Sequence, residues 1–374
     1  MSASDRHLTA GREALARAAW QEAKSSFEAS LEAEETPEAL EGLGLAAAWL
    51  SEGEAFLDAH ERAYRLYRQR GAARDAARMA FFLAVAAYNF RGDPAITSGW
   101  LERARRLLEG LEPGAEGALV ALQEGHLALL IEHDPGRART LCAEAAALAG
   151  DAGETNLEMF ALGLDGLALV TQGEVAEGMR RLDEATTAAT SGELTDPIAI
   201  HNVCCYLIYA CKRVRDFDRA GQWCERVKEI AERWSDRQMF ATCRTHYADV
   251  LVWRGAWAEA ESELDAAARE LEAAAPHRVA DATVRLAELR RRQGRLGEAE
   301  SLLEDAERHP LSPLVRAALV LDRGDAERAG DLAERYLRQR PAEERTERVP
   351  GLELLARARL ALGDREAAAR AASE

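Results

Sequence analysis

The sequence is short of the residues and patterns that several fold and function classes require. Aromatic residues make up 6% of the 374 residues, and the few runs of valine, isoleucine and threonine do not alternate as strands do. No apolar run approaches the roughly 18 residues of a membrane-spanning helix. The net charge of −17 leaves no basic excess for nucleic-acid phosphates or anionic lipid. We therefore expect neither a β-fold nor a membrane span, and no direct binding of nucleic acid or membrane.

Motifs for catalysis and for cofactors are missing as well. The sequence has no GxxxxGK[ST] phosphate loop, no GxSxG elbow and no HExxH helix. Acidic residues alternate with arginines at helix-surface spacing, which indicates ion pairing. His126, His133 and His246 each lack a sequence-near partner for acid–base chemistry. We expect a protein that is not an enzyme and uses no cofactor; an active site assembled from distant segments is the alternative.

What the sequence has in quantity is helix formers. Hydrophobic residues make up 48% and charged residues 30%, a balance typical of a chain that forms a core. Alanine, leucine, glutamate and arginine dominate, and these residues have the highest helix propensities. The sequence predicts an all-α fold.

A short phrase recurs along the chain: a helix breaker, a few polar residues, a small residue, and an apolar residue four positions later. Its clearest copies are Gly173–Gly178 with Leu182 and Gly255–Ala260 with Leu264. The small residues of all copies are Ala23, Ala59, Gly99, Ala138, Gly178, Ala220, Ala260, Ala299, Ala329 and Ala368. Successive spacings are 36, 40, 39, 40, 42, 40, 39, 30 and 39 residues, so the phrase marks a repeated unit of about 40 residues.

The phrase is typical of a helix pair. The breaker ends the first helix, the small residue lets the second helix pack closely on it, and the apolar residue fills the space between them. It resembles the tetratricopeptide pattern, with a longer unit. That resemblance implies a right-handed α–α superhelix of about nine to ten helix pairs, in which each unit contacts only its neighbours and first helices line a concave face.

We expect residues 1–374 to form a single array of this kind. The unit at 311–340 is short, which predicts a shortened first helix and a bend in the array. The last second helix begins at Arg365 and stops at Glu374, and arrays normally finish with a solvating cap helix. We expect a C-terminal end truncated from a longer parent; a frayed end is the alternative.

Several longer phrases resemble the helical-repeat region of actinobacterial LuxR-type transcriptional regulators. They are ETPEALEGLGLAAAWL, HERAYRLYRQRG, LALVTQGEVAEGMRRLDEAT, CCYLIYACKRVRDFDRAGQWC and VRLAELRRRQGRLGEAESLL. The likeness runs from about Gly11 to Leu362. In that family such arrays commonly precede a DNA-reading helix-turn-helix, and some members carry an ATPase module; neither is found here. The resemblance implies a sensory or scaffolding segment that binds a ligand or a partner protein.

The tetratricopeptide register predicts which side chains face the groove. A mixture of aromatic, amide and charged groups on a concave surface is typical of a seat for a peptide or small ligand. The predicted groove residues are Tyr88, Gln123, Asn202, Tyr209, Arg213, His246, Asp249 and Trp253. Phe160, Leu167 and Val170 are expected to make the channel apolar at the fifth unit. The alternative is that Tyr209 and Trp253 pack between helices while Arg213 and Asp249 are solvated.

The cysteines have two interpretations. They are Cys142, Cys204, Cys205, Cys211, Cys224 and Cys243. Their spacing matches no closed zinc pattern, and Cys224 falls on the packing position of the repeat, so we expect small buried core residues rather than metal ligands. Reduced thiols indicate a cytoplasmic protein.

The basic run Arg290–Arg292 with Arg295 has acidic neighbours and no interleaved aromatics, so we expect a solvated face rather than a nucleic-acid patch. Two functional hypotheses remain. In the first, the chain is the sensor segment of a bacterial transcriptional regulator and an effector in the groove changes the curvature of the solenoid. In the second, it is a free-standing scaffold that binds a peptide or helix of another protein.

Overall fold

A computed structural model describes residues 2–234 and 237–374, which form twenty α-helices, one 3-10 helix and no strand. The first helices of the pairs are α1 (Ala3–Ala16), α3 (Pro37–Trp49), α5 (Ala73–Arg91), α7 (Ala115–Leu130), α9 (Thr155–Gln172), α11 (Pro197–Arg213), α13 (Arg237–Arg254), α15 (Val279–Arg292), α17 (Ser312–Asp322) and α19 (Arg345–Ala361). The second helices are α2 (Trp20–Ala33), α4 (Gly53–Gln69), α6 (Pro94–Leu108), α8 (Pro135–Ala152), α10 (Val175–Ser191), α12 (Phe217–Trp234), α14 (Trp257–Ala274), α16 (Leu296–Asp305), α18 (Ala326–Arg338) and α20 (Arg365–Ser373). The 3-10 helix η1 (Pro276–Arg278) follows α14.

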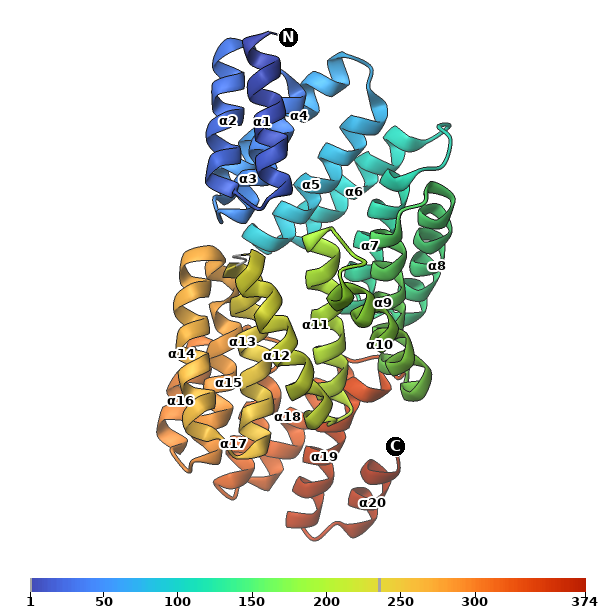
Figure 1. Cartoon of the computed structure of the whole chain (residues 1–374). Coiled ribbons are helices and arrows are strands. Elements are labelled where there is room, and N and C mark those ends of the chain that lie inside the picture. The colour runs from blue at the N-terminus through green and yellow to red at the C-terminus, as the bar shows by residue number, and fades with distance from the viewer. Residues whose placement is uncertain (1, 235–236) are drawn as a thin grey trace.

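Consecutive helices pack on one another along the whole array, and most first helices, from α5 to α19, also contact the first helix of the next unit. Figure 1 shows the units winding from the N-terminal pairs, through α7–α10 on one side, to the C-terminal pairs at the opposite end. The core is a series of alanine- and leucine-rich layers between adjacent pairs. This arrangement confirms the predicted all-α superhelix of helix pairs.

The repeat phrase falls at a fixed place in these pairs. The small residue is the fourth residue of the second helix and is buried, as Ala23, Ala138 and Ala260 show. In the fifth unit the approach is so close that a Cβ on Gly178 would lie 2.6 Å from the carbonyl oxygen of Gly166 on α9. Only a residue without a side chain fits there.

One of the predicted packing residues, Gly99, is wrong, and another, Ala59, is buried but does not stand at the fourth position. The fourth residue of α4 is Phe56 rather than Ala59, and the fourth residue of α6 is Thr97 rather than Gly99, which is exposed. No glycine stands five residues before Phe56, and α6 begins with Pro94 directly after Asp93, so in both units the spacing alone leads to a residue C-terminal to the fourth position.

In the second unit a large side chain, Phe56, stands at the fourth position of α4, and a different side chain fills the space between the helices. His60 occupies the place that Phe27 and Leu182 hold in other units, and its ring packs on Phe56 with centroids 4.2 Å apart. Gly44 on α3 leaves the space for the imidazole, because a Cβ there would lie 2.2 Å from His60 Cε1.

Units that are distant in sequence also touch. α19 contacts α9, and η1 contacts α5. The prediction that each unit contacts only its neighbours is therefore wrong: α9 and α19 are the first helices of the fifth and tenth units, so the superhelix returns on itself after about five units. Tight curvature narrows the inner face and replaces part of the expected open groove with contacts between turns.

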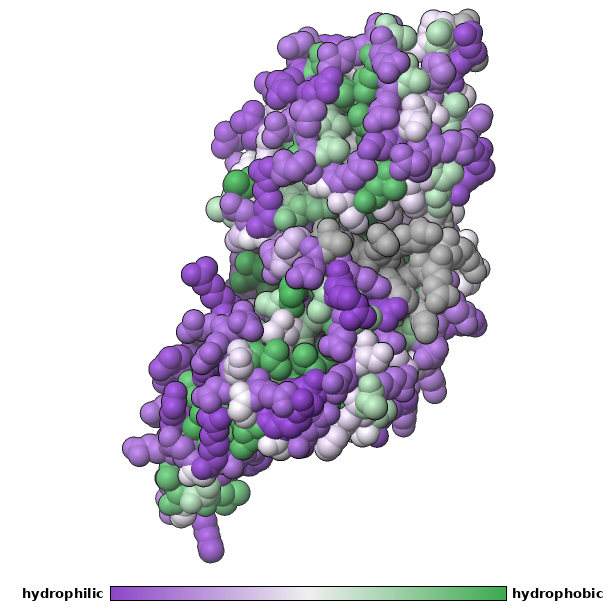
Figure 2. All heavy atoms as spheres, turned by 90° about the vertical axis from the view of Figure 1, so that its left-hand side faces the viewer, coloured by the Kyte–Doolittle hydropathy of each residue, from purple (hydrophilic) through white to green (hydrophobic). Residues whose placement is uncertain are grey.

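The short unit is as predicted, since α17 has 11 residues. Hydrophilic side chains dominate the face in Figure 2, with smaller apolar patches between them. Among the residues described, none of the helices combines the length and the apolar character that a membrane crossing needs.

Candidate functional site

The inner face of the superhelix gathers a group of charged and aromatic side chains around α11. We define the central cluster as Tyr209, Lys212, Arg213, His246, Asp249, Arg285 and Glu347. The side chains come from four first helices, α11, α13, α15 and α19. The cluster therefore joins three successive units to the last one.

Local sequence explains why α11 presents this strip. Asp196 caps the helix by accepting from the backbone N–H of Ile198, and Pro197 occupies the first turn, where its missing N–H costs nothing. Along the helix, Val203, Leu207 and Cys211 are buried in the layer between pairs. Tyr206, Tyr209 and Arg213 recur at spacings of three and four residues and share the inward face.

Arg213 links three helices. Its guanidinium donates to Thr171 Oγ1 on α9 and forms an ion pair with Glu347 on α19. The same group lies over the ring of Tyr209, with its central carbon 4.3 Å from the ring centroid. The side chain of Arg213 is only 8% exposed, so these contacts replace nearly all of its hydration. The alternative that Arg213 is solvated is therefore wrong, and its guanidinium is held by protein groups.

Asp249 holds the other half of the cluster. It forms an ion pair with Lys212 and accepts from Arg285 Nε at 2.9 Å. Burial acts to raise the pKa of Asp249, but Lys212 and Arg285 outweigh it and the pKa is lowered, so the carboxylate is charged.

His246 completes this half as a neutral base. Burial, and then the charge of Lys212, hold the pKa of His246 well below its ordinary value. Lys212 Nζ lies 3.0 Å from His246 Nδ1 and donates to it, since an ammonium group can only donate. Burial lowers the pKa of Lys212 also, with Asp249 opposing the shift.

The structure brings four of the predicted groove residues together: Tyr209, Arg213, His246 and Asp249. The rings of Tyr209 and His246 have centroids 5.6 Å apart. Tyr88 lies farther along the inner face, where its ring meets that of His126 edge-on at 5.5 Å.

The other three predicted residues do not join the cluster. Asn202 donates to the carbonyl of Ile198 in its own helix at 2.8 Å. Gln123 lies partly buried on α7. Trp253 stands at the end of α13, 45% exposed, stacked on Phe217 and covered by the guanidinium of Arg292 at 4.0 Å.

The sequence contained a signal for part of what was missed. Arg213, Asp249 and Arg285 follow one another at 36-residue steps, whereas the repeat is about 40 residues, so charges of alternating sign shift by about one helical turn from each first helix to the next. Glu347 had no such signal, because it reaches the cluster only through the return of the superhelix.

A second contact between turns lies at the α7–α8 connection. His133 Nδ1 is 3.1 Å from Glu344 Oε1, and Arg340 Nη1 is 2.7 Å from the same ring nitrogen. Glu344 is 2% exposed. Arg215 and Glu353 add an exposed ion pair between the α11–α12 connection and α19.

The thiols are buried in the layers between helices. Cys142, Cys204, Cys211 and Cys224 are each 6% exposed or less, and burial raises the pKa of Cys211 and Cys224 to about 12. This confirms the packing interpretation for these four, while Cys205 is only partly buried and the side chain of Cys243 lies outside the described residues. In the described part of the chain, no group of three His, Cys, Asp or Glu side chains is placed to hold a metal ion.

The basic run is not the solvated face that was expected. Arg290 Nη2 binds Glu261 Oε1 at 2.6 Å and is almost completely buried, and Arg291 pairs with Glu288 at 2.7 Å and with Asp322. These guanidiniums connect α15 to the helices on either side of it.

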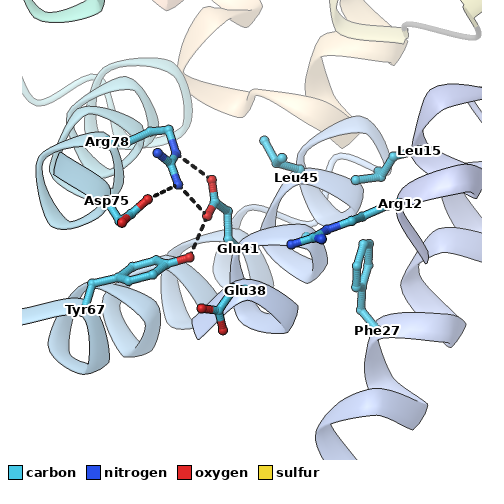
Figure 3. A pocket seen from close by; sticks show the side chains of 10 residues that line it. Arg12, Leu15, Phe27, Glu38, Glu41, Leu45, Tyr67, Asp75 and Arg78 are labelled. Atoms are coloured by element: carbon cyan, nitrogen blue, oxygen red, sulfur yellow. Dashed lines mark hydrogen bonds and ion pairs between the residues drawn. The ribbon is translucent and has the colours of Figure 1, made fainter. Parts of the chain in front are cut away.

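A separate hollow of about 340 Å³ lies among α1–α5. Figure 3 shows its polar wall, in which Arg78 Nε and Nη2 donate to Glu41 at 2.7 and 3.0 Å and the Tyr67 hydroxyl donates to the same carboxylate at 3.0 Å. Asp75 accepts from Arg78 at 2.8 Å. The sequence did not predict this hollow, because its polar residues lie on three different helices.

Comparison of the sequence with protein-family models and with curated proteins gives no match. Solved structures do resemble the chain. A Rap protein complexed with Competence and Sporulation Factor has a TM-score of 0.66 at 13% identity, covering 90% of this chain and 95% of its own. The apo form of the quorum sensor NprR from B. thuringiensis has a TM-score of 0.51 at 13% identity, covering 88% and 95% respectively. At this identity the likeness concerns the fold alone, and the chain has the fold of a tetratricopeptide-like helical solenoid.

Proposed function

We propose that the chain is a binding protein without catalytic activity, and that it takes up a peptide or small effector on the inner face at the central cluster. The observation that carries the proposal is the bridge from Arg213 on α11 to Thr171 on α9 and Glu347 on α19. A ligand with its own anionic group would compete with Glu347 for this guanidinium.

Such competition would act on the shape of the whole array. The bridge holds two turns of the superhelix together, so a ligand that binds better when the bridge is open shifts the population toward a less tightly wound form. Each unit stacks on the next, and a change in the winding therefore moves the ends of the array relative to each other.

The fold neighbours support a sensory role in general terms. One is a Rap protein seen with a bound factor, and the other is a quorum sensor. The resemblance to LuxR-type regulators supports a setting in the cytoplasm, next to a DNA-binding module in a bacterial transcriptional regulator. The full reading frame tests this setting, and a frame without such a module favours the free-standing scaffold.

The binding proposal is tested with one double variant and one control. In Tyr209→Ala/Arg213→Gln the stacked pair at the centre of the cluster is removed. Arg226→Gln removes an equal charge from an exposed position of α12, where Arg226 pairs with Glu229 at 3.3 Å.

Peptides and metabolites that stabilise the wild-type chain in a thermal-shift screen are measured again by isothermal titration. We expect the double variant to lose at least tenfold in affinity, about the value of one charge-assisted hydrogen bond, while Arg226→Gln binds as the wild type does. Ligands that bind both variants equally well would place the site elsewhere.

A further inference from the structure

The hollow at the N-terminal end has no part in the proposal above, and its charges are arranged differently. Three carboxylates share two guanidiniums: Arg78 contacts Glu41 and Asp75, its Nη1 lies 3.7 Å from Glu116, and Arg74 Nη1 lies 3.3 Å from the same Glu116. The Tyr67 hydroxyl adds one hydrogen bond to Glu41. Negative charge on this wall is therefore incompletely compensated.

The facing wall carries the opposite imbalance. Arg12 of α1 extends into the hollow, and Figure 3 draws no hydrogen bond or ion pair for it among the side chains shown. Arg12 is exposed, so among the described residues its charge is solvated by water rather than paired with a carboxylate. The hollow thus presents an uncompensated cation on one side and surplus carboxylate on the other.

Apolar groups lie beside Arg12. Leu15 of α1, Leu45 of α3 and Phe27 of α2 line this part of the hollow. Its volume of about 340 Å³ is at the lower end of the roughly 300–1,000 Å³ range of ligand pockets. The space suits a small molecule better than an extended chain.

From these features we propose that the hollow is a binding site for a small zwitterion with an aliphatic side chain, such as a dipeptide or tripeptide. Its carboxylate pairs with Arg12, its ammonium group faces Glu41 and Asp75, and its side chain rests on Leu15 and Leu45. Each charged end of the ligand faces a wall of the opposite charge. This complementarity selects a zwitterion over a simple anion or cation.

Isothermal titration with dileucine and trileucine tests the site, using the full chain. N-acetyl-dileucine keeps the carboxylate but loses the ammonium charge, and dileucine amide keeps the ammonium but loses the carboxylate. We expect one of the free peptides to bind and each capped form to bind at least tenfold more weakly, because each has lost one charge-assisted contact.

Arg12→Gln is expected to weaken binding by about tenfold, and Arg12→Lys to retain most of it. Arg65→Gln is the matched control, since Arg65 on α4 is exposed and pairs with Glu61 at 3.8 Å. Circular dichroism confirms that each variant is folded.

The proposal is overturned if neither free peptide binds, if the capped forms bind as well as the free ones, or if Arg12→Gln equals the wild type. This proposal is tested independently of the binding proposed at the central cluster. Tyr209→Ala/Arg213→Gln should bind the free peptides normally, whatever happens to effectors at the inner face.

Discussion

In the N-terminal hollow and in the central cluster, the same residue types meet under different conditions. Arg78 and Asp75 in the hollow are 25% and 39% exposed, and water reaches much of their surface. Arg285 and Asp249 in the cluster are 7% and 21% exposed and lie where two turns of the superhelix meet. Ion pairs that water screens contribute little to stability, whereas buried ones become costly as soon as one partner is removed. The comparison indicates that the N-terminal hollow is suited to exchange ligands, whereas the central cluster stabilises the array.

The sharpest test of that contrast is Asp249→Ala. It leaves Lys212 and Arg285 buried side by side without the carboxylate that both contact. Removing one partner of such a buried group costs about 3–5 kcal/mol. We expect the free energy of unfolding in urea to fall by this amount. A loss below about 1 kcal/mol would show that water enters the cluster and that the contrast with the hollow is wrong.

A smaller effect is expected at His60, the polar exception in the N-terminal core. Burial lowers the pKa of His60 to about 4, and its Nε2 has no hydrogen-bond partner. Below pH 6.5 the unfolded chain binds a proton that the folded chain refuses, so stability is full above that pH and falls as the pH decreases toward 4. Between pH 7 and pH 5 this group accounts for a loss of about 2 kcal/mol.

His60→Leu should remove that share of the pH dependence and place leucine where α10 has Leu182. Thermal unfolding at pH 7 and pH 5 measures it, and the variant should lose about 2 kcal/mol less than the wild type over this interval. His126, whose pKa burial also lowers to about 4, and His246, whose pKa burial holds well below its ordinary value, contribute to the dependence that remains. Parallel pH profiles for wild type and variant would exclude a buried neutral His60.

The smallest effect is expected for Asp75→Ala in the hollow. Arg78 keeps both of its hydrogen bonds to Glu41, and the lost contact is an exposed one between neighbours in a single helix. The free energy of unfolding should change by less than about 1 kcal/mol. A change as large as that of Asp249→Ala would mean that the hollow is a structural centre and not an open site.

The fold could be predicted from the sequence because its information is local and repeated. The spacing of Ala138, Gly178 and Ala220 indicated the pairs, and the breaker before each second helix indicated where it begins. Where the breaker was missing, as before Phe56, the register was lost. Local phrases define the pairs but do not fix the small rotation from one unit to the next.

The rotation between units determines which distant helices meet, and therefore which residues form the central cluster. The register predicted Tyr209 and Asp249 on one face, and the structure brings both into the central cluster because neighbouring first helices lie side by side. It could not place Glu347, which is more than 130 residues from Arg213 and meets it only because the winding closes after about five units. The hollow was missed for a similar reason, because Arg12 and Arg78 share it only through the arrangement of three helix pairs.

The contact of α9 with α19 has a consequence for how the chain comes apart. Repeat arrays commonly unravel from an end, one unit after another, because every unit is held only by the next. Here the last turn of the superhelix also packs on the middle of the chain, through the contact of α19 with α9. Unfolding of the final pairs must break the ion pair between Arg213 and Glu347. The amides of the last turn should therefore exchange hydrogen nearly as slowly as those of the central units, and both regions should unfold together.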